Sequence, residues 1–167
     1  ILRALEGAFE DITGRRLEMN VSGGRERTLE LSWGGETLLF GELPDGLRSL
    51  LNWLAGWVVL QADHFADAPR PLEKPVTLLL DEPENHLHPA WQRRVLPTLQ
   101  RLFPAAQMFV VTHSPFVASS LNEGWIHKFT RHDDDKVRME ARRASRGDSY
   151  MTAVQEILDL TEWFDPE

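Results

Sequence analysis

The sequence of 167 residues contains no cysteine, which excludes disulfide bonds and thiolate-bound metal sites. It also lacks any run that approaches the roughly 18 consecutive apolar residues of a membrane-spanning helix. The most apolar stretch, residues 50–60, is interrupted by Asn52 and predicts a buried helix. The net charge of −8 excludes a surface that is basic throughout. We therefore expect a globular, cytoplasmic domain with no membrane contact.

A phosphate-binding loop of the form G-x-x-x-x-G-K-[ST] is absent as well. Neither glycine pair, at 23–24 or 34–35, is followed by Lys-Ser or Lys-Thr, so neither can wrap a β-phosphate. The chain begins with Ile1 rather than methionine, and residues 162–167 follow a helical pattern with no sign of a deliberate ending. These features predict that the chain is a segment of a longer protein.

The first part of the chain changes from a strand pattern to a helix pattern. Apolar residues at helical spacing predict a short helix over 1–10. The glycine pairs separate three predicted strands and favour an antiparallel meander of 16–21, 28–33 and 36–40. After Gly46, leucines recur at i, i+3, i+4 and i+7, which predicts a long amphipathic helix that ends near His64.

The middle of the chain alternates strands and helices. Residues 76–80 and 108–112 are continuous apolar runs, which are typical of strands buried on both faces of a parallel sheet. Between them Pro89 begins an amphipathic helix, at a position where its missing N–H costs nothing. This order predicts an α/β fold, with the antiparallel meander added at the amino-terminal end and one domain over 1–167.

The last part of the chain predicts a hairpin and a helix. The hairpin joins strands 125–129 and 137–141, and the helix covers 149–160. The acidic run 133–135 is better explained as a solvated turn than as a cation site. Contacts of Arg142, Arg143 and Arg146 with nucleic acid are disfavoured against a solvated tail.

Two adjacent acids follow the first buried strand. Asp81 and Glu82 come directly after the leucines at 78–80, at the carboxyl edge where open α/β sheets bind ligands. Adjacent residues of an extended chain point to opposite sides, so the two carboxylates can have different roles. Asp81 can accept a hydrogen bond from a water on Mg²⁺, and Glu82 can orient and deprotonate a water aimed at a γ-phosphate. For this motif alone, two acids that merely cap a strand and its turn are an equally good explanation.

Two further segments carry polar groups at comparable positions. His113 follows the second strand within T-H-S-P at 112–115, where an imidazole can hydrogen-bond a phosphate oxygen. A lone histidine more often satisfies a strand end, but two neighbouring strands that deliver polar groups to one edge favour a site. Residues 43–46 begin the long helix, where free backbone N–H groups can meet an anion.

In this order the segments resemble the motifs of ABC-type ATPases. Residues 43–47 resemble the signature loop, 76–82 the Walker B strand, 85–89 the D-loop and 112–114 the H-loop. The motif sequences L-P-D-G, L-L-L-D-E-P-E, L-H-P and T-H-S-P are most similar to those of SMC-like and RecF-like heads and of the OLD-like ATPases of bacterial defence systems. The resemblance covers residues 36–121, and its four motifs keep both order and spacing.

The resemblance implies the carboxy-terminal lobe of an ABC-type ATPase head, which binds and hydrolyses ATP with Mg²⁺ as a homodimer of heads. It implies that Asp81 is the Walker B aspartate, which holds Mg²⁺ through water. Glu82 would be the catalytic base and His113 the switch histidine. The signature loop would face the γ-phosphate bound to the other subunit, and the D-loop would cross the dimer interface. These loops consist of Leu43, Pro44, Asp45 and Gly46, and of Asn85, His86, Leu87 and His88.

The chain departs from the family pattern in two ways. Pro44 stands where the family has its signature serine, so only backbone N–H groups remain to meet the γ-phosphate. The phosphate loop, which in the family lies ahead of these motifs in the same polypeptide, is absent. We therefore expect the carboxy-terminal half of a head, which needs its missing amino-terminal lobe as a partner and is inactive or nearly so alone.

Other interpretations stay open beside this one. The main alternative is a non-catalytic interaction module with structural acids, whereas a helicase-like motor fragment is disfavoured by the signature-like loop and by His113. A metal site at His86 and His88 is disfavoured, because histidines at i, i+2 match no established ligand motif. The process driven by ATP is open between DNA repair and phage defence, with defence preferred because no coiled coil interrupts 46–81. DNA and an associated nuclease are open as further partners.

Overall fold

The structure is a computed structural model that describes residues 1–23, 28–131 and 136–144. The helix predicted over 149–160, the acidic run 133–135 and Arg146 lie outside the described residues. In chain order the main elements are α1 (Leu2–Thr13), β1 (Leu17–Ser22), β2 (Thr28–Trp33), β3 (Glu36–Leu39), α2 (Asp45–His64), β4 (Val76–Asp81), α3 (Pro89–Leu102), β5 (Ala106–Val111), α4 (Pro115–Ala118), β6 (Trp125–Arg131) and β7 (Val137–Arg143). Short 3-10 turns lie at Phe40–Glu42 and Pro71–Glu73.

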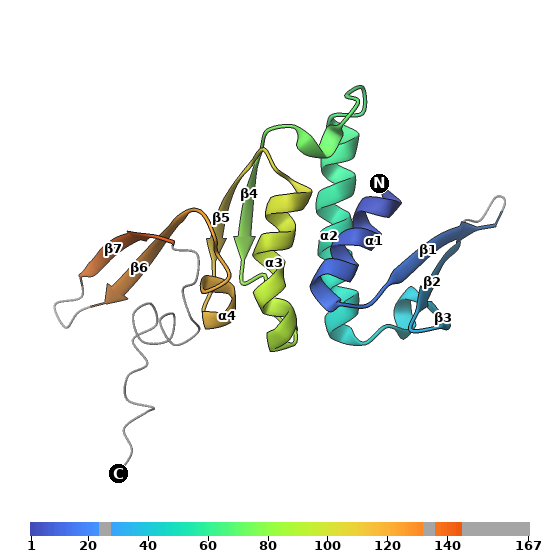
Figure 1. The fold of residues 1–167 in the computed structure, drawn as a ribbon, viewed down its shortest axis with the longest axis horizontal. Coiled ribbons are helices and arrows are strands. Elements are labelled where there is room, and N and C mark those ends of the chain that lie inside the picture. The colour runs from blue at the N-terminus through green and yellow to red at the C-terminus, as the bar shows by residue number, and fades with distance from the viewer. Residues whose placement is uncertain (24–27, 132–135, 145–167) are drawn as a thin grey trace, which may run out of the picture.

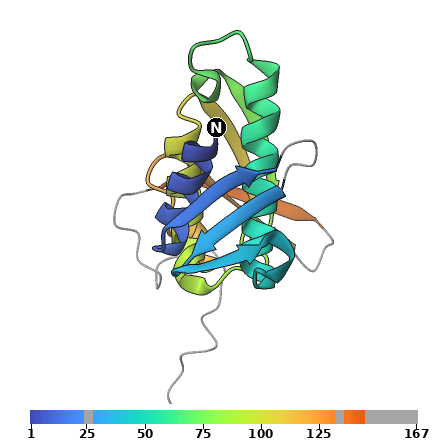
Figure 2. The same cartoon turned by 90° about the vertical axis from the view of Figure 1, so that its right-hand side faces the viewer.

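The first three strands form the predicted antiparallel meander. They lie in the order β1–β2–β3, and Met19 pairs with Leu31, which pairs in turn with Leu38. Met19 and Leu31 are buried, because alternate residues of a strand turn toward the same face. The meander therefore packs one side on the core, and Figure 2 shows it lying across the helices behind it.

The three long helices form the central layer. Figure 1 shows α1, α2 and α3 between the meander on one side and the β4–β5 sheet on the other. The apolar spacing that predicted α2 is the spacing of its buried residues, Leu47, Leu50, Leu54 and Val58. These leucines join side chains of α1 and α3 in one continuous hydrophobic core. Burial of that shared face, rather than helix propensity alone, holds the helices in place.

Strands β4 and β5 pair in parallel, and α3 is the crossover between them. The register aligns Leu79 with Phe109 and Asp81 with Val111. The expectation that both strands are buried on both faces is wrong for the described part of the chain. The face with Leu78 and Leu80 packs on the helices, whereas Leu79 is 68% exposed and Phe109 is 53% exposed. The apolar runs thus supply two hydrophobic faces, and the described helices cover one of them.

The remaining strands confirm the predicted hairpin. β6 and β7 pair antiparallel, with Trp125 opposite Arg143 and Phe129 opposite Met139. The hairpin extends away from the central layer beyond α4 (Figure 1). Together the elements make the predicted mixed α/β fold, in which a parallel pair of strands and an antiparallel amino-terminal meander enclose helices.

Candidate functional site

The carboxyl ends of β4 and β5 bring the predicted acids and histidine to one edge of a sheet. Asp81 is the last residue of β4, and the N–H of Glu82 donates to the carbonyl of Val111 over 2.8 Å. This bond extends the parallel ladder by one step, so the two chains leave the sheet side by side. The prediction that these strands are neighbours with Asp81, Glu82 and His113 at the same edge is confirmed.

Glu82 and His113 face each other at this edge. Nε2 of His113 lies 3.7 Å from Oε1 of Glu82, with side-chain exposures of 83% and 40%. The other carboxylate oxygen of Glu82 accepts a hydrogen bond from Nδ2 of Asn85 over 2.9 Å. Glu82 has a φ of 43°, in the left-handed region that is uncommon for residues other than glycine. Strained backbone of this kind concentrates at functional sites, and here it sets Glu82 at the start of a tight turn.

Asp81 is exposed at the end of β4 and pairs with no side chain in the described ranges. Because Leu80 beside it points into the core, strand alternation turns Asp81 to the outer face with Leu79. In the part of the chain that the structure describes, no three His, Asp or Glu side chains gather as a metal site. A cation at this edge would therefore have one or two protein carboxylates and would take its other ligands from water or a substrate.

Glu84 connects the two turns and had no role assigned to it from the sequence. Glu84 is buried, with 8% of the residue exposed. Oε1 accepts three hydrogen bonds: from the hydroxyl of Thr112, from the N–H of His113 over 3.1 Å and from the N–H of Ser114 over 3.1 Å. Oε2 is buried and has no hydrogen-bond partner among the described residues. The sequence marks Glu84 as a third acid within four residues and as the last residue of the motif L-L-L-D-E-P-E, and neither signal reveals burial.

Gln92 of α3 makes a second connection between the same turns. Its Nε2 donates to the carbonyl of Leu87 over 2.9 Å, and its Oε1 accepts from the hydroxyl of Ser114 over 2.6 Å. The Ser114 oxygen in turn accepts from two backbone amides at the start of α4. The turns after β4 and β5 are thus tied together directly by Glu84 and through α3 by Gln92.

The D-loop-like segment, residues 85–88, forms the turn between Glu82 and α3. Leu87 is buried in the core. His88 is the N-cap of α3, and its Nδ1 accepts from the N–H of Ala90 over 3.2 Å. His86 is exposed with a φ of 64°. A capping hydrogen bond accounts for His88, whereas Asn85 and His86 stay on the surface.

The signature-like segment, residues 43–46, packs against this turn within the same chain. Leu43 is buried, and Pro44 is the N-cap of α2 with no side-chain hydrogen bond to the helix end. Asp45 forms an ion pair with Arg48 one turn along. A Cβ added at Gly46 would collide with the carbonyl oxygen of His86. Among the described residues, no hydrogen bond or ion pair joins 43–46 to Glu82 or His113.

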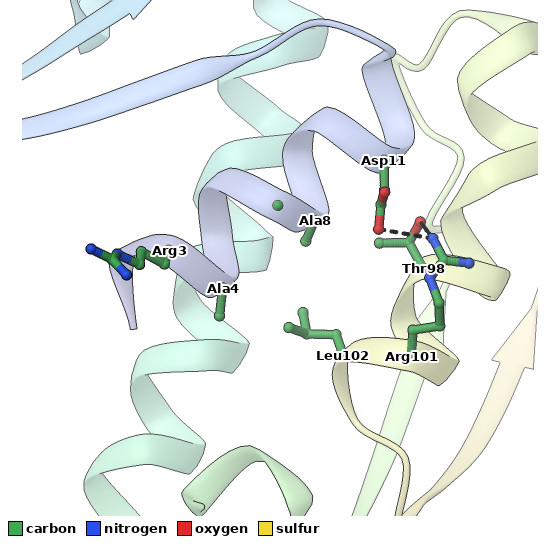
Figure 3. Close-up of a pocket in the computed structure, with 8 residues that line it drawn as sticks. Arg3, Ala4, Ala8, Asp11, Thr98, Arg101 and Leu102 are labelled. Atoms are coloured by element: carbon green, nitrogen blue, oxygen red, sulfur yellow. Dashed lines mark hydrogen bonds and ion pairs between the residues drawn. The ribbon is translucent and has the colours of Figure 1, made fainter.

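A shallow hollow elsewhere on the surface lies between α1 and α3 (Figure 3). Arg101 and Asp11 form an ion pair across it at 2.9 Å. It lies by the last turn of α3, next to the start of β5, and so at the opposite end of the sheet from Asp81. Its lining consists of Arg3, Ala4, Gly7, Ala8, Asp11, Thr98, Arg101 and Leu102.

None of the helices in residues 1–23, 28–131 and 136–144 has the length and apolarity needed to cross a membrane.

Bacterial proteins with similar sequences include two retron probable ATPases and a Septu protein. The chain is 40% identical over 81 residues to the Retron Ec83 probable ATPase of Escherichia coli, a match that covers 48% of this chain and 15% of that protein. It is 40% identical over 48 residues to the Septu protein PtuA of Bacillus thuringiensis, which covers 28% of this chain and 12% of that protein. The Retron Vc95 probable ATPase of Vibrio cholerae is 39% identical over 54 residues, or 30% of this chain and 10% of that protein. The chain thus spans less than a sixth of the length of each of these relatives.

Solved structures with the same fold are SMC ATPase heads. One, described in terms of ATP-driven dimerization and DNA stimulated activation of SMC ATPases, superposes with a TM-score of 0.62 at 19% identity, over 99% of this chain and 92% of that one. The Smc head domain of Pyrococcus furiosus, bound to the C-terminal domain of ScpA, superposes with a TM-score of 0.57 at 17% identity, over 96% of this chain and 37% of that one. At these identities the likeness establishes the fold.

The family comparison covers the site. Residues 34–119 match the model of the family described as AAA domain, putative AbiEii toxin, Type IV TA system. This range contains both turns of the site and the signature-like segment, and it lies within the stretch 36–121 on which the resemblance was based, apart from its first two residues. The chain belongs to this AAA domain family and has the fold of an SMC-type ATPase head.

Proposed function

We propose that this chain is the carboxy-terminal lobe of an ATPase head, which hydrolyses ATP between two heads once an amino-terminal lobe with a phosphate loop completes it. The observation that carries the proposal is the approach of Glu82 and His113 to 3.7 Å at the carboxyl edge of parallel strands. A carboxylate and an imidazole that converge at such an edge suit a water nucleophile and a phosphate. Both side chains are open to solvent, so a nucleotide can reach them.

Glu82 is proposed as the base of the reaction. Its Oε2 accepts a hydrogen bond from Asn85, and its Oε1, which lies 3.7 Å from Nε2 of His113, would orient a water molecule and accept its proton. The water oxygen would form a bond to the γ-phosphorus while the bond to the β,γ-bridging oxygen breaks, and ADP and phosphate would be released. His113 would donate a hydrogen bond to a γ-phosphate oxygen and so respond to its presence.

The carboxylates present fit a Mg²⁺ ion. This ion takes oxygen ligands, keeps several waters and is usually held by one or two carboxylates together with substrate phosphates. Asp81, exposed and unpaired beside Glu82, suits a contact through water. When bound, Mg²⁺ would neutralise charge on the phosphates.

Residues 43–46 and 85–88 are proposed to work across a dimer of heads. The amino-terminal end of α2 has no side-chain capping hydrogen bond, so its first N–H groups are available to a γ-phosphate held by the other subunit. Pro44 supplies no hydroxyl, and the contact would rest on backbone groups alone. The exposed Asn85 and His86 would lie toward the partner head.

The relatives favour a bacterial defence setting over DNA repair. Three of the proteins similar in sequence are named for retron and Septu systems. We propose that the complete protein uses ATP within a system of this kind, in which DNA or an associated nuclease is the further partner.

The test is steady-state ATP hydrolysis by the full-length protein and by its Glu82→Gln variant. Loss of a general base lowers the rate by about 10²–10⁴-fold, and ATP binding should survive, so the variant should accumulate as an ATP-bound dimer in size-exclusion chromatography. Glu73→Gln, an exposed glutamate paired with Arg70, is the matched control and should hydrolyse ATP normally. If Glu82→Gln hydrolyses ATP at the unmodified rate, Glu82 is not the base and a non-catalytic interaction module becomes the better explanation.

A further inference from the structure

Glu84 is an unusual residue for a turn that only has to connect a strand to a helix. It is a buried acidic residue, 8% exposed, and no ion pair of the described residues includes it. Burial of a carboxylate is unfavourable unless strong hydrogen bonds compensate for the lost water. All the compensation here comes through one oxygen, Oε1, and all of it comes from the turn after β5. The Glu84 side chain therefore stabilises the turn after β5 rather than the turn that contains it.

The three donors surround His113 in the sequence. They are the hydroxyl of Thr112, the N–H of His113 itself and the N–H of Ser114. The N–H of Ser114 also donates to the Thr112 hydroxyl over 3.0 Å, which closes the turn on itself. These bonds fix the backbone on both sides of the His113 Cα. Within the described ranges the side chain of His113 makes only the 3.7 Å approach to Glu82, so its direction depends on that backbone.

Glu84 stands two residues after Glu82, in the same turn. The N–H of Asn85 donates to the carbonyl of Glu82 over 3.0 Å, and the buried Pro83 lies between the two glutamates. The Glu84 side chain belongs to this turn and accepts hydrogen bonds from residues 112–114. It therefore sets the distance between Glu82 and His113. A small displacement of either turn would open that distance, and misplacement of reacting groups by about 1 Å can lower a rate by about 10²-fold.

We propose that Glu84 is a positioning residue, whose acceptor oxygen holds His113 at the separation from Glu82 that ATP hydrolysis requires. The inference rests on the proposed ATPase function. Glu84 does not touch substrate in this scheme, and it acts only through His113. What matters is an acceptor oxygen at the Oε1 position and not a negative charge.

The test measures kcat and KM for ATP with the full-length protein. Glu84→Ala removes the acceptor, and we expect kcat to fall about 10²-fold with little change in KM. Glu84→Gln keeps an acceptor oxygen of the same reach, and kcat should stay within about threefold of the unmodified value. Equal losses for Glu84→Gln and Glu84→Ala would mean that charge is what counts, and would overturn the proposal.

A double-mutant cycle separates positioning from general stability. If Glu84 acts through His113, then Glu84→Ala should lower kcat no further once His113→Ala is present. Losses that multiply in the double variant would overturn the proposal, because Glu84 would then act independently of His113. If Glu84→Ala does not fold, Thr112→Val takes its place: it removes one donor of the three at nearly constant volume. Introduced alone, Thr112→Val should lower kcat. Introduced together with His113→Ala, it should leave kcat at the His113→Ala value. If Thr112→Val alone leaves kcat unaltered, the inference is contradicted.

This outcome can be told apart from a failure of the proposed function. If Glu82→Gln leaves hydrolysis unchanged, the ATPase proposal itself is wrong. If Glu82→Gln stops hydrolysis while folded Glu84→Ala keeps the unmodified kcat, the head is an ATPase and only the role of Glu84 is wrong.

Discussion

At the scale of single residues, the site depends on close backbone contacts as much as on functional groups. The carbonyl of His86 fills the space where a side chain at position 46 would begin, so glycine is required there for steric reasons. The signature-like segment and the D-loop-like segment are thereby in direct contact within one chain. A change at Gly46 would alter both segments, whatever either of them contacts across a dimer.

Replacement of this glycine tests the contact. Gly46→Ala would force the His86 carbonyl aside, and overpacking of this kind lowers the free energy of unfolding by about 1–3 kcal/mol. The control is Gly56→Ala in the same helix, where an added Cβ meets nothing within 4 Å. There the free energy of unfolding should rise by about 0.5–1 kcal/mol, since alanine favours helix. Urea unfolding of both variants measures the difference, and equal shifts would contradict the proposed collision.

Replacement of His113 should affect the rate of hydrolysis and leave stability nearly unchanged. Its side chain is 83% exposed, so His113→Ala should change the free energy of unfolding by no more than about 0.5 kcal/mol. Loss of a hydrogen bond to developing charge should lower kcat of the full-length protein by about 10²-fold. Parallel measurements of ATP hydrolysis and urea unfolding test this prediction. A variant that loses stability but keeps its rate would show that His113 is structural.

The sequence predicted the residues whose neighbours lie close in the chain. Asp81, Glu82 and His113 all lie within two residues of the end of an apolar run, so prediction of the two strands was enough to place them at one edge. Glu84 and Gln92 act across hydrogen bonds between segments about 20–30 residues apart. Nothing in the local sequence distinguishes a buried acid in D-E-P-E from an exposed one, so their roles required the structure.

At the scale of elements, the β4–β5 sheet is the feature that matters most. Periodicity predicted its two strands, and their apolar runs implied two hydrophobic faces. The apolar runs predicted burial of both faces, but they carry no information about which segments of the protein would pack on each face. Leu79, Phe109 and Val111 are all more than half exposed on the outer face. Exposed apolar residues gathered on one face in this way are typical of a surface that another segment or a partner covers.

Leu79 and Leu80 provide a matched pair for this surface. If the amino-terminal lobe covers the outer face, Leu79→Ala should lower the free energy of unfolding of the full-length protein by about 2–5 kcal/mol. In residues 1–167 expressed alone, the same change should cost no more than about 0.5 kcal/mol, because Leu79 is exposed there. Leu80→Ala, on the buried face, should cost about 2–5 kcal/mol in both proteins. An equal, small effect of Leu79→Ala in both would show that the outer face stays uncovered.

At the scale of the whole molecule, the fold is that of an SMC-type head although the chain has no phosphate loop. The loop would supply the lysine and most of the N–H groups that grip the β- and γ-phosphates. Residues 1–167 alone should therefore bind ATP weakly or not at all. Calorimetric titration with ATP and Mg²⁺ tests this, with the full-length protein as the control that binds. Micromolar affinity of residues 1–167 would contradict the interpretation of this chain as half of a head.

Gln92 couples the turn after β4 to the turn after β5. Its amide nitrogen donates a hydrogen bond to Leu87 in the D-loop-like segment, and its amide oxygen accepts one from Ser114, next to His113. Its backbone belongs to α3, a helix of 14 residues. If two heads meet at residues 85–88, as proposed, a displacement of Leu87 would pass through the Gln92 side-chain amide to Ser114, next to His113. The proposed contact between heads and the proposed contact with phosphate would then be coupled in one movement.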